Sequence, residues 1–324
     1  MSGFTITAGV SFSGGFTMTN APAASENTAA WFAGGYTAAI GGSNFSRVDR
    51  ITFATDTDTA SVRGPLSATT NCAAGSSNFT DAWFGGAGVS MATRSSVQRI
   101  TFATDTATAS VRGPLSGGRF YMAAAGNTTD GWFGGGRPAP SPFSTVDRIT
   151  YATDTATASV RGPLSSGRLS LAAAGNTDYA WFGGGTPGSG YVSTVDRITY
   201  ATDTATASVR GPLSATRGNL AAAGNTTDGW FAGGSPAQSL VDRITYATDT
   251  ATASVRGPLS AGRYTLAAGG NTTDGWFGGG RPTSFQGQRS TVERITYATD
   301  TATASVRGPL SSSRYQLAAA GGIQ

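Results

Sequence analysis

The sequence contains no histidine and no lysine, and its 324 residues include a single cysteine. Without histidine the chain lacks the commonest general base, the usual partner of a serine or cysteine nucleophile, and the most frequent zinc ligand. Cys72 cannot form an internal disulfide, and we expect it to fill a small core position in place of a leucine. These absences predict a protein that is not an enzyme, with no metal site and no cofactor.

The chain also lacks clustered charge and long apolar runs. Its 22 basic residues are all arginines, set against 18 acids, and 17 of the arginines recur at fixed positions of a repeat. Such spacing spreads charge around the molecule, whereas nucleic-acid binding needs a cluster, so we expect no nucleic-acid partner. No segment approaches the roughly 20 apolar residues of a membrane span, and residues 1–15 do not resemble a secretory signal. We expect synthesis in the cytoplasm and no membrane insertion.

What the chain has in abundance is glycine, alanine, threonine and serine, arranged in repeats of about 49 residues. Two independent anchors, an Arg-Ile-Thr triplet and a Trp-Phe pair, each occur six times. The triplets begin at Arg50, Arg99, Arg148, Arg197, Arg243 and Arg294, and the pairs begin at Trp31, Trp83, Trp132, Trp181, Trp230 and Trp276. A period in the forties with several short strands per unit is typical of β-propeller blades.

The fourth copy shows the predicted strands of one unit. A first strand covers 171–174, a turn of Gly, Asn, Thr and Asp covers 175–178, and a second strand covers 180–184. The third strand covers 195–202 and the fourth covers 205–213, where proline ends the ladder. A two-residue tip between the last two strands predicts that Ile198 pairs with Val209 and Tyr200 with Ala207.

The same register places two arginines of each hairpin opposite each other, such as Arg50 and Arg63. Facing cations are unfavourable, so we expect acids or carbonyl groups of the same or the next blade to accept their hydrogen bonds. The expected acceptors, with one neutral exception at Gln98, are Asp49, Asp147, Asp196, Asp242 and Glu293. The aspartate at each hairpin tip is expected to form an Asx turn, because the pair Asp56 and Asp58 supplies too few ligands for calcium.

The two ends of the chain indicate that the repeats close into a ring. The sequence finishes with a lone first strand over 315–322, while the first landmark near the N-terminus is a second strand at Trp31. Pairing these two segments would remove exposed strand edges. We therefore predict an all-β fold, a six-bladed β-propeller of four-stranded blades over residues 21–324, with alanine and glycine of the inner strands crowded around its axis.

The order of Arg-x-x-x-Ala-Ala-Ala, an apolar pair before Gly-Gly, and Val-Asp-Arg-Ile-Thr-Tyr-Ala-Thr-Asp-Thr resembles the kelch repeat of galactose-oxidase-type propellers. The double glycine occurs six times, the first at Gly34-Gly35. The tryptophan that kelch units carry after the third-strand turn is replaced here by alanine or threonine, and tryptophan instead precedes the double glycine. The resemblance implies a propeller; the copper chemistry of galactose oxidase is excluded because it needs histidine.

The connections from second to third strands differ in every copy, whereas a 14-residue segment through the hairpin is identical in copies two to six. In kelch-like propellers these connections share a face with the links between blades. We predict a recognition face there, because arginine and aromatic residues dominate interaction sites. Its candidate residues are Arg119, Arg168, Arg217, Arg263, Arg314, Tyr36, Phe45, Met91, Arg94, Arg137, Phe143, Tyr191, Phe285 and Arg289.

These features favour a non-catalytic structural and interaction protein whose partners are other subunits of an assembly. The Thr-Ala-Ser-Val-Arg-Gly-Pro-Leu-Ser repeats are similar to those of tail or fibre proteins of marine bacteriophages, which implies a virion or extracellular assembly. The alternative is a carbohydrate-binding or adhesive module that binds a cell-surface glycan through the variable face.

Residues 1–20 fit no repeat and alternate polar with apolar residues, as a strand does. Left free, Phe4, Ile6, Val10 and Phe12 would expose an aggregation-prone edge. We expect this N-terminal arm to pack either on its own propeller, as an extra strand or cover, or on a neighbouring subunit.

Overall fold

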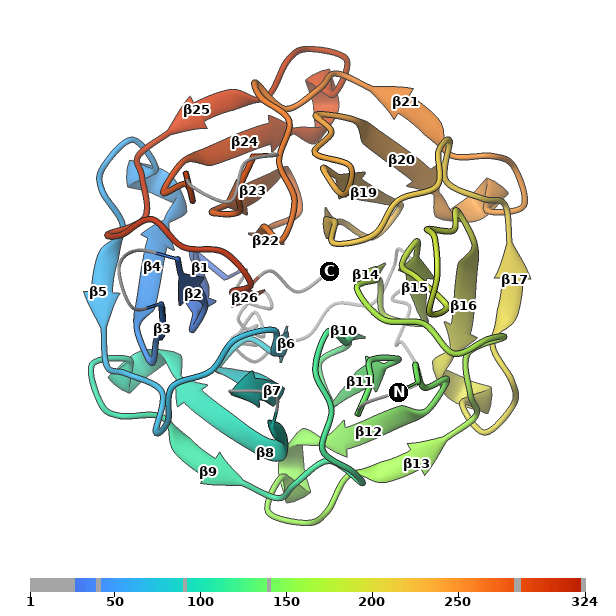
Figure 1. The fold of residues 1–324 in the computed structure, drawn as a ribbon, viewed down its shortest axis with the longest axis horizontal. Helices are drawn as coiled ribbons and strands as arrows, with labels where there is room; N and C mark the ends of the chain where they lie inside the picture. Colours follow the sequence, from blue (N-terminus) through green and yellow to red (C-terminus); the bar gives the residue numbers. More distant parts are fainter. Residues whose placement is uncertain (1–26, 39–41, 90–91, 139–140, 283–286, 322–324) are drawn as a thin grey trace, which may run out of the picture.

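The computed structural model describes residues 27–38, 42–89, 92–138, 141–282 and 287–321, which form a ring of six antiparallel sheets (Figure 1). Each sheet has four strands and is one blade, so the chain is a six-bladed β-propeller, as its sequence predicts. The arm expected over residues 1–20 lies outside the described residues.

In five blades the strands run from the axis outward in chain order, and in the sixth the innermost strand comes from the end of the chain. The innermost are β6 (Ala74–Ser77), β10 (Ala123–Gly126), β14 (Ala172–Gly175), β18 (Ala221–Gly224), β22 (Ala267–Gly270) and β26 (Ala318–Ala320). The second are β1 (Ala29–Ala33), β7 (Asp81–Val89), β11 (Asp130–Gly134), β15 (Tyr179–Gly183), β19 (Asp228–Ala232) and β23 (Asp274–Gly278). The third are β4 (Val48–Thr52), β8 (Ala92–Thr101), β12 (Val146–Thr150), β16 (Val195–Thr199), β20 (Val241–Thr245) and β24 (Val292–Thr296). The outermost are β5 (Ser61–Arg63), β9 (Ser110–Arg112), β13 (Ser159–Arg161), β17 (Ser208–Arg210), β21 (Ser254–Arg256) and β25 (Ser305–Arg307).

The ring is closed by the two ends of the repeat array, as predicted. Strand β26 pairs antiparallel with β1, with Trp31 opposite Ala320, in the sheet ordered β26-β1-β4-β5. This blade therefore joins segments nearly 300 residues apart in the sequence. A short additional hairpin, β2 (Tyr36–Thr37) with β3 (Ser43–Asn44), extends from the same blade.

Small residues at the axis let six inner strands approach one another. The space along the axis is lined almost entirely by alanine and glycine, with Ser76 and Ser77 the exceptions. A Cβ atom on Gly75 would come within 2.3 Å of the carbonyl oxygen of Ala319 in the adjacent blade. Larger side chains at these positions would therefore force the ring open.

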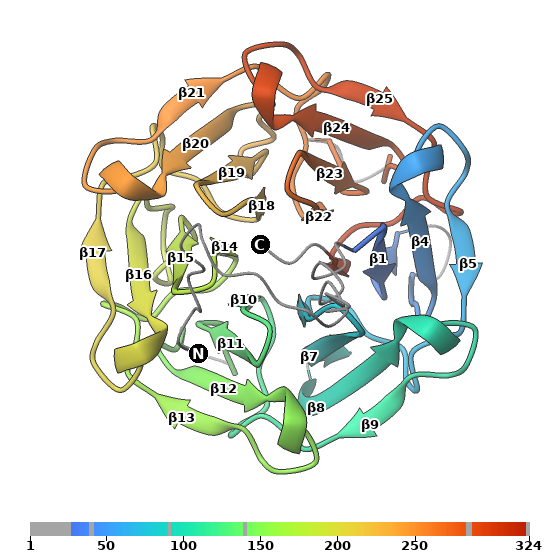
Figure 2. The ribbon, with the colours of Figure 1, turned by 180° about the vertical axis from the view of Figure 1, so that it is seen from behind.

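The hairpin register predicted for the outer strands is wrong. Asp196 lies opposite Val209 and Arg197 opposite Ser208, because the chain leaves the strand at Thr199 and turns through a 3-10 helix, η4 (Tyr200–Thr202). The stacking of its first residue, Tyr200, on the preceding blade replaces continued pairing. The 3-10 helices lie on the side nearest the viewer in Figure 2, and they are η1 (Phe53–Thr55), η2 (Phe102–Thr104), η3 (Tyr151–Thr153), η4 (Tyr200–Thr202), η5 (Tyr246–Thr248) and η6 (Tyr297–Thr299).

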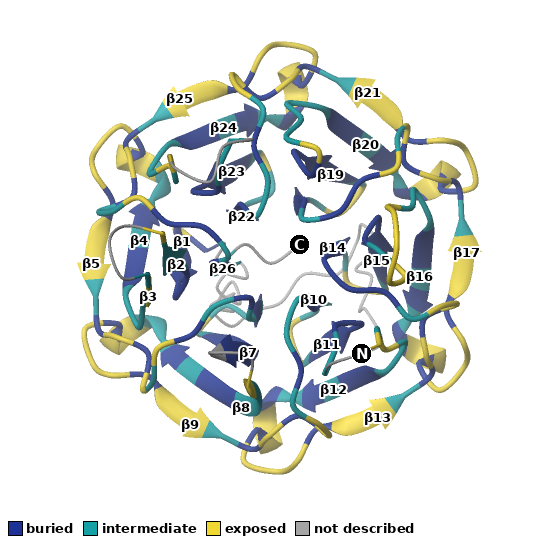
Figure 3. Cartoon of the chain, in the orientation of Figure 1, coloured by how far each residue is buried: buried dark blue, intermediate teal, exposed yellow. Residues whose placement is uncertain are grey.

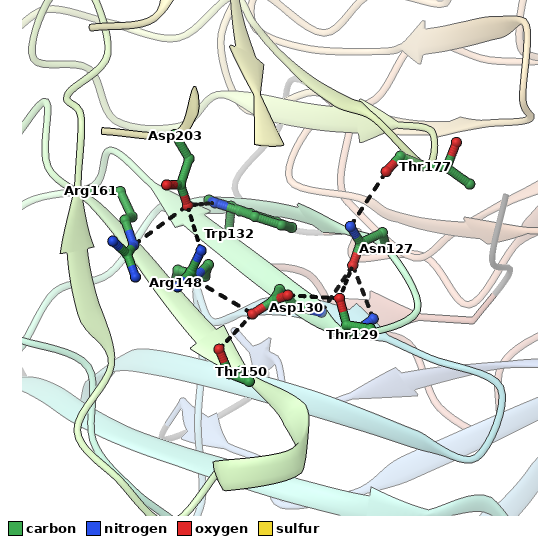
Figure 4. Close-up of polar contacts among 9 residues, drawn as sticks. All are labelled: Asn127, Thr129, Asp130, Trp132, Arg148, Thr150, Arg161, Thr177 and Asp203. Atoms are coloured by element: carbon green, nitrogen blue, oxygen red, sulfur yellow. Dashed lines mark hydrogen bonds and ion pairs between the residues drawn. The ribbon is translucent and has the colours of Figure 1, made fainter. Parts of the chain in front are cut away.

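One carboxylate joins each blade to the next, as Figure 4 shows for Asp203. This aspartate follows η4 and accepts hydrogen bonds from Trp132 Nε1 at 2.9 Å and Arg148 Nη1 at 3.2 Å, both in the preceding blade. The Nε atom of Arg161 lies 3.4 Å from the same carboxylate oxygen. The Trp132 ring also stacks on Tyr200 with centroids 3.7 Å apart. We call this arrangement the blade joint.

The joint is repeated six times around the ring. Its aspartates are Asp56, Asp105, Asp154, Asp203, Asp249 and Asp300, each of which accepts a hydrogen bond from a tryptophan and an arginine of the preceding blade. The expectation that these aspartates mainly form Asx turns is therefore wrong, as is the expected pairing of Arg50 with Arg63. The hairpin arginines do donate hydrogen bonds to acids of the next blade, but the acceptors are the joint aspartates and not Asp49 and its counterparts.

A glycine fits the backbone of each blade against the joint. Gly162 N donates to the carbonyl oxygen of Asp203 at 2.7 Å, and a Cβ atom on Gly162 would lie 1.9 Å from the carbonyl oxygen of Ala205. The constant Arg-Gly-Pro and Asp-Thr-Ala elements of the repeat are thus the two halves of one contact between blades. This contact explains why the hairpin segment is so uniform.

The hydrophobic core lies between neighbouring blades. Trp132 and Leu164 pack with Phe182, Ile198 and Tyr200 of the following blade in one of six equivalent clusters. Burial decreases from the inner strands to the exposed outermost strands, as the colouring of Figure 3 shows. Each blade thus buries its faces only against its neighbours, which makes closure a requirement for stability.

The predicted turn between the first two strands is present and links adjacent blades. Asn127 Oδ1 accepts from the backbone N–H groups of Thr129 and Asp130, forming an Asx turn. Its Nδ2 donates to the carbonyl oxygen of Thr177 in the next blade (Figure 4). Asp130 Oδ1 accepts from Thr150 Oγ1 at 2.5 Å.

We expect Asp203→Ala to lower the free energy of unfolding by about 2–4 kcal/mol, because it leaves one indole and two arginines of a mostly buried joint without their acceptor. Urea denaturation followed by tryptophan fluorescence measures the change. The exposed neighbour Thr204 provides the control, since Thr204→Ala should change stability by less than about 0.5 kcal/mol. Equal effects of the two substitutions would contradict the role of the joint.

Alkaline pH should destabilise the ring through its buried phenols. Burial raises the pKa of Tyr151, Tyr200, Tyr246 and Tyr297 above the ordinary value near 10. Their neutral form therefore stabilises the fold fully below about pH 10, and this contribution is lost as the pH rises further. We expect urea midpoints to fall above pH 10, and to fall less in a variant with all four changed to phenylalanine, the residue found at Phe53 and Phe102. The same pH dependence in both proteins would contradict this.

Candidate functional site

The propeller has one constant and one variable face. The 3-10 helices and hairpin tips, which are nearly identical in all copies, lie on the face seen in Figure 2. The opposite face, seen in Figure 1, carries the connections from second to third strands and the links that cross from each outer strand to the next inner strand. Backbone bridges such as Phe120 to Arg137 join a link to a connection, which confirms that both share this face. We call it the variable face.

The five arginines of the links do not point into solvent, so their prediction as a recognition surface is wrong. Arg168 is fully buried and donates to the carbonyl oxygens of Gly184 and Thr194 and to Asp196 at 2.7 Å. Burial lowers the pKa of Arg168, against the opposing effect of Asp196. Equivalent pairs are Arg119 with Asp147, Arg217 with Asp242, Arg263 with Glu293, and Arg314 with Asp49.

These pairs also correct the partner expected for Asp49 and its counterparts. They bind the link arginines and not the arginines of the hairpin, because their side chains are buried under the link. Each pair anchors the link to the roots of the variable connection, so the arginines support the variable face from beneath.

One blade lacks the pair, and both of its partners are replaced together. Thr70 stands in place of the link arginine, and Gln98 in place of the acid. Gln98 Oε1 still accepts from the N–H and the hydroxyl of Ser67, at 2.6 and 2.7 Å. Removing only one member would leave a buried charge without its partner, which is strongly unfavourable. Because both charged residues are replaced in the same blade, no buried charge is left without a partner.

Six residues surround the axis at the centre of the variable face, one from each link. Each donates its backbone N–H to the carbonyl oxygen of its counterpart in the preceding blade, at 2.7–3.0 Å, so six hydrogen bonds close a ring. Their φ angles of 54–59° lie in the left-handed region, although none is glycine. We call them the mouth residues: Cys72, Tyr121, Ser170, Asn219, Thr265 and Gln316.

A left-handed conformation costs a non-glycine residue about 1–3 kcal/mol and persists only where surrounding contacts impose it. Here the closed hydrogen-bond ring imposes it, so six unlike side chains occupy equivalent positions on one constant backbone. They line a cavity with the leucines that follow them, such as Leu220 and Leu266. The residue immediately before each mouth residue also varies, and only Tyr264 and Tyr315 are alike.

The mouth residues are uncharged and hydrogen-bonding. Gln316 Nε2 donates to the hydroxyl of Tyr121 across the mouth, passing the blade that carries Cys72. Thr265 Oγ1 donates to the carbonyl oxygen of Tyr264 at 2.6 Å. Cys72 is buried here, one position before the leucine site where we expected it; Ala73 occupies that site.

Aromatic and arginine side chains gather on one side of the mouth. The Arg281 guanidinium lies 4.8 Å from the ring centre of Tyr264 and 4.5 Å from that of Tyr315, which contacts Tyr36 edge-on. Such cation–π contacts hold a planar cation and flat rings in fixed positions. Arg137 lies over Phe120 in the same manner, at 5.4 Å. This second pair belongs to blade β10–β13, on the opposite side of the ring, whereas blades β14–β17 and β18–β21 carry smaller residues in these places.

The other predicted residues of the variable face differ in exposure. Phe143 and Tyr191 are each 40% exposed, the largest exposures of any aromatic residue in the described part of the chain, and Arg289 is also exposed. Half-buried positions are Tyr36, Phe45, Arg94 and Arg137. Met91 and Phe285 lie outside the described residues. The mouth residues are not among the predicted residues, although their position, two residues before the first alanine of each inner strand, differs in every copy.

No cluster of three or more histidine, cysteine, aspartate or glutamate side chains suited to a metal ion occurs among the described residues. Within the same ranges the helices are turns of three residues, none long or apolar enough to cross a membrane.

No family model matches the chain, and no curated protein sequence matches it. Among solved structures, 410 chains match this chain, so the fold itself is a common one. One of them, the structure of YjhT, aligns with 88% of this chain and 96% of that chain, with a TM-score of 0.69 and 11% sequence identity. This similarity shows the β-propeller fold alone.

Cys72 should react slowly with a thiol reagent despite its place beside the mouth. Burial raises the pKa of its thiol to about 12, so almost no thiolate is present at pH 8. We expect DTNB labelling at pH 8 to be at least a hundredfold slower in the folded protein than in guanidinium chloride. Comparable rates in the two conditions would show that the mouth is open to the thiol.

Proposed function

We propose that the protein is a non-catalytic interaction protein, in which a rigid propeller presents the variable face to a partner within an assembly. A propeller fold is consistent with a protein-interaction scaffold. The observation that carries the proposal is the contrast within one chain: the joints are nearly identical, while six equivalent mouth positions hold six different side chains on the same backbone. Differences confined to one face, at positions that packing does not determine, favour recognition.

The chemistry of the mouth supports binding in preference to catalysis. Its side chains are hydroxyl and amide groups, with one buried thiol whose raised pKa makes it a poor nucleophile. No histidine is available to activate a hydroxyl, and the nearby arginines can only donate hydrogen bonds. Fixed donors and acceptors of this type select a partner by hydrogen bonding.

An assembly component of the phage tail or fibre type is the specific role that we favour. The repeats resemble such proteins and, more broadly, the kelch type of blade. A ring whose hydrophobic clusters lie between blades is also rigid. Its variable connections project from one side, so that side is available to bind a partner while the other side attaches to the assembly.

A carbohydrate-binding role is the second candidate, and the aromatic side of the mouth favours it. The guanidinium of Arg281 lies over the rings of Tyr264 and Tyr315, and Tyr36 contacts Tyr315 edge-on. Flat apolar rings beside planar polar groups are suited to a sugar, which has an apolar ring face and hydroxyl edges.

The test exchanges the mouth residues of one blade for those of another. Phe120→Leu with Tyr121→Ser copies Leu169-Ser170, which the same backbone already accepts. We expect the propeller to remain folded, with some loss of stability from the lost contacts of Tyr121 and Phe120, but at least a tenfold loss of incorporation into the assembly purified from the natural source, measured by co-sedimentation. The control, Thr106→Ala with Thr108→Ala, alters exposed residues of the constant face and should incorporate normally.

Normal incorporation of the mouth variant, or loss with the control alone, would contradict the proposed use of the variable face. A glycan array probed with both variants tests the second candidate. Glycan binding that the mouth variant loses, together with normal incorporation, would favour the carbohydrate role.

A further inference from the structure

The arginines of the constant face are matched in number by carboxylates. Two arginines from each of six hairpins contact the joint aspartates, and five further aspartates lie at the turns beside the axis. Asp58, an exposed residue of the first hairpin tip, brings the acids on this face to twelve, which equals the number of hairpin arginines. The constant face therefore carries no net charge.

The variable face has an excess of positive charge. Its five link arginines are neutralised by their five buried acids, which leaves the five arginines that do not belong to the repeat: Arg47, Arg94, Arg137, Arg281 and Arg289. The five positive charges of these arginines, less the negative charge of Glu26, which lies outside the described residues, give the formal net charge of +4. The net charge of the chain thus comes from one face.

These five arginines lie on four consecutive blades. They belong to the blades built on β22–β25, on β26-β1-β4-β5, on β6–β9 and on β10–β13, which Figure 1 shows side by side from red through blue to green. The blades β14–β17 and β18–β21 carry none. In the described part of the chain, no carboxylate lies within 4 Å of Arg47, Arg94, Arg137 or Arg289.

Their field reaches the buried arginines beneath them. Burial lowers the pKa of Arg314 to about 10; Asp49 opposes this change, and nearby Arg47 adds to it. Burial likewise lowers the pKa of Arg263, against Glu293 and with a further lowering by Arg289. Arg47 and Arg289 are therefore held near other arginines that already have their own acids, and an anionic partner would supply the acid that these two do not have.

We propose that the variable face binds a protein partner through an acidic surface that covers these four blades. The inference rests on the proposed function, since it names the chemistry of the partner for the same face. Charge complementarity of this kind guides encounter and selects the partner.

The residue types favour a protein partner over a polysaccharide or a nucleic acid. Protein interfaces are enriched in arginine, tyrosine and phenylalanine and depleted in lysine. In this chain, which has no lysine, the four blades combine the arginines with exposed Phe143, and exposed Tyr191 lies on the next blade. The arginines are separated over four blades and do not form the continuous track that the phosphate backbone of a nucleic acid needs.

The first experiment measures binding of fluorescent poly-L-glutamate, with polygalacturonate as the acidic polysaccharide and single-stranded DNA as the nucleic acid. The test variant is R94Q/R137Q/R289Q, and R94K/R137K/R289K is the matched control that keeps the charge. We expect poly-L-glutamate to bind more tightly than the other two probes and to weaken with salt. The glutamine variant should lose at least tenfold in affinity, and the lysine variant less than threefold. Stronger binding of either other polymer, or an unchanged glutamine variant, would overturn the inference.

The second experiment separates this inference from the proposed function by measuring incorporation into the native assembly. If the glutamine variant incorporates poorly, like the mouth variant described above, both proposals are supported. If the glutamine variant incorporates normally while the mouth variant fails, the variable face binds a partner without these arginines, and the inference of an acidic partner surface is wrong. If both incorporate normally, the proposed function itself is wrong.

Discussion

The structure depends on one repeated interaction, a buried carboxylate that accepts hydrogen bonds from a tryptophan and an arginine of the neighbouring blade. Asp203 with Trp132 and Arg148 is one of six such joints. A four-stranded blade cannot cover its own faces, so its stability comes from these joints and from the clusters between blades. Closure through β26 and β1 completes the sixth joint, which brings Asp56 to Trp276 across 220 positions of the sequence.

This dependence explains which parts of the repeat are constant and which vary. The 3-10 helix, the Arg-Gly-Pro segment and the tryptophan each contribute to a joint, and a change in any of them would disturb two blades at once. The connections on the other face contribute to no joint. They are anchored from below by link arginines such as Arg168, so their tips can differ in length and sequence while their roots stay in place. A rigid ring with one variable face is the result.

The sequence was sufficient to predict the number of blades, the strand order and the closure, because six aligned copies specify them. It was insufficient for contacts between blades. The strand register failed at Tyr200, whose stacking on Trp132 ends the strand, and no pattern within one repeat indicates a partner in the next. The burial of the link arginines could not be predicted, because the acids of four of them lie 25–30 positions away and the acid of Arg314 lies 265 positions away. The mouth residues were missed since left-handed backbone at non-glycine positions has no sequence signal.

The central claim is that constant residues build the ring and that the variable face alone meets the partner. The most direct measurement is a cryo-electron microscopy map of the protein in its native assembly. Density of the partner should contact the mouth and the four arginine-bearing blades and leave the 3-10 helices free. A partner seated on the face of the 3-10 helices, with the mouth open to solvent, would contradict the account.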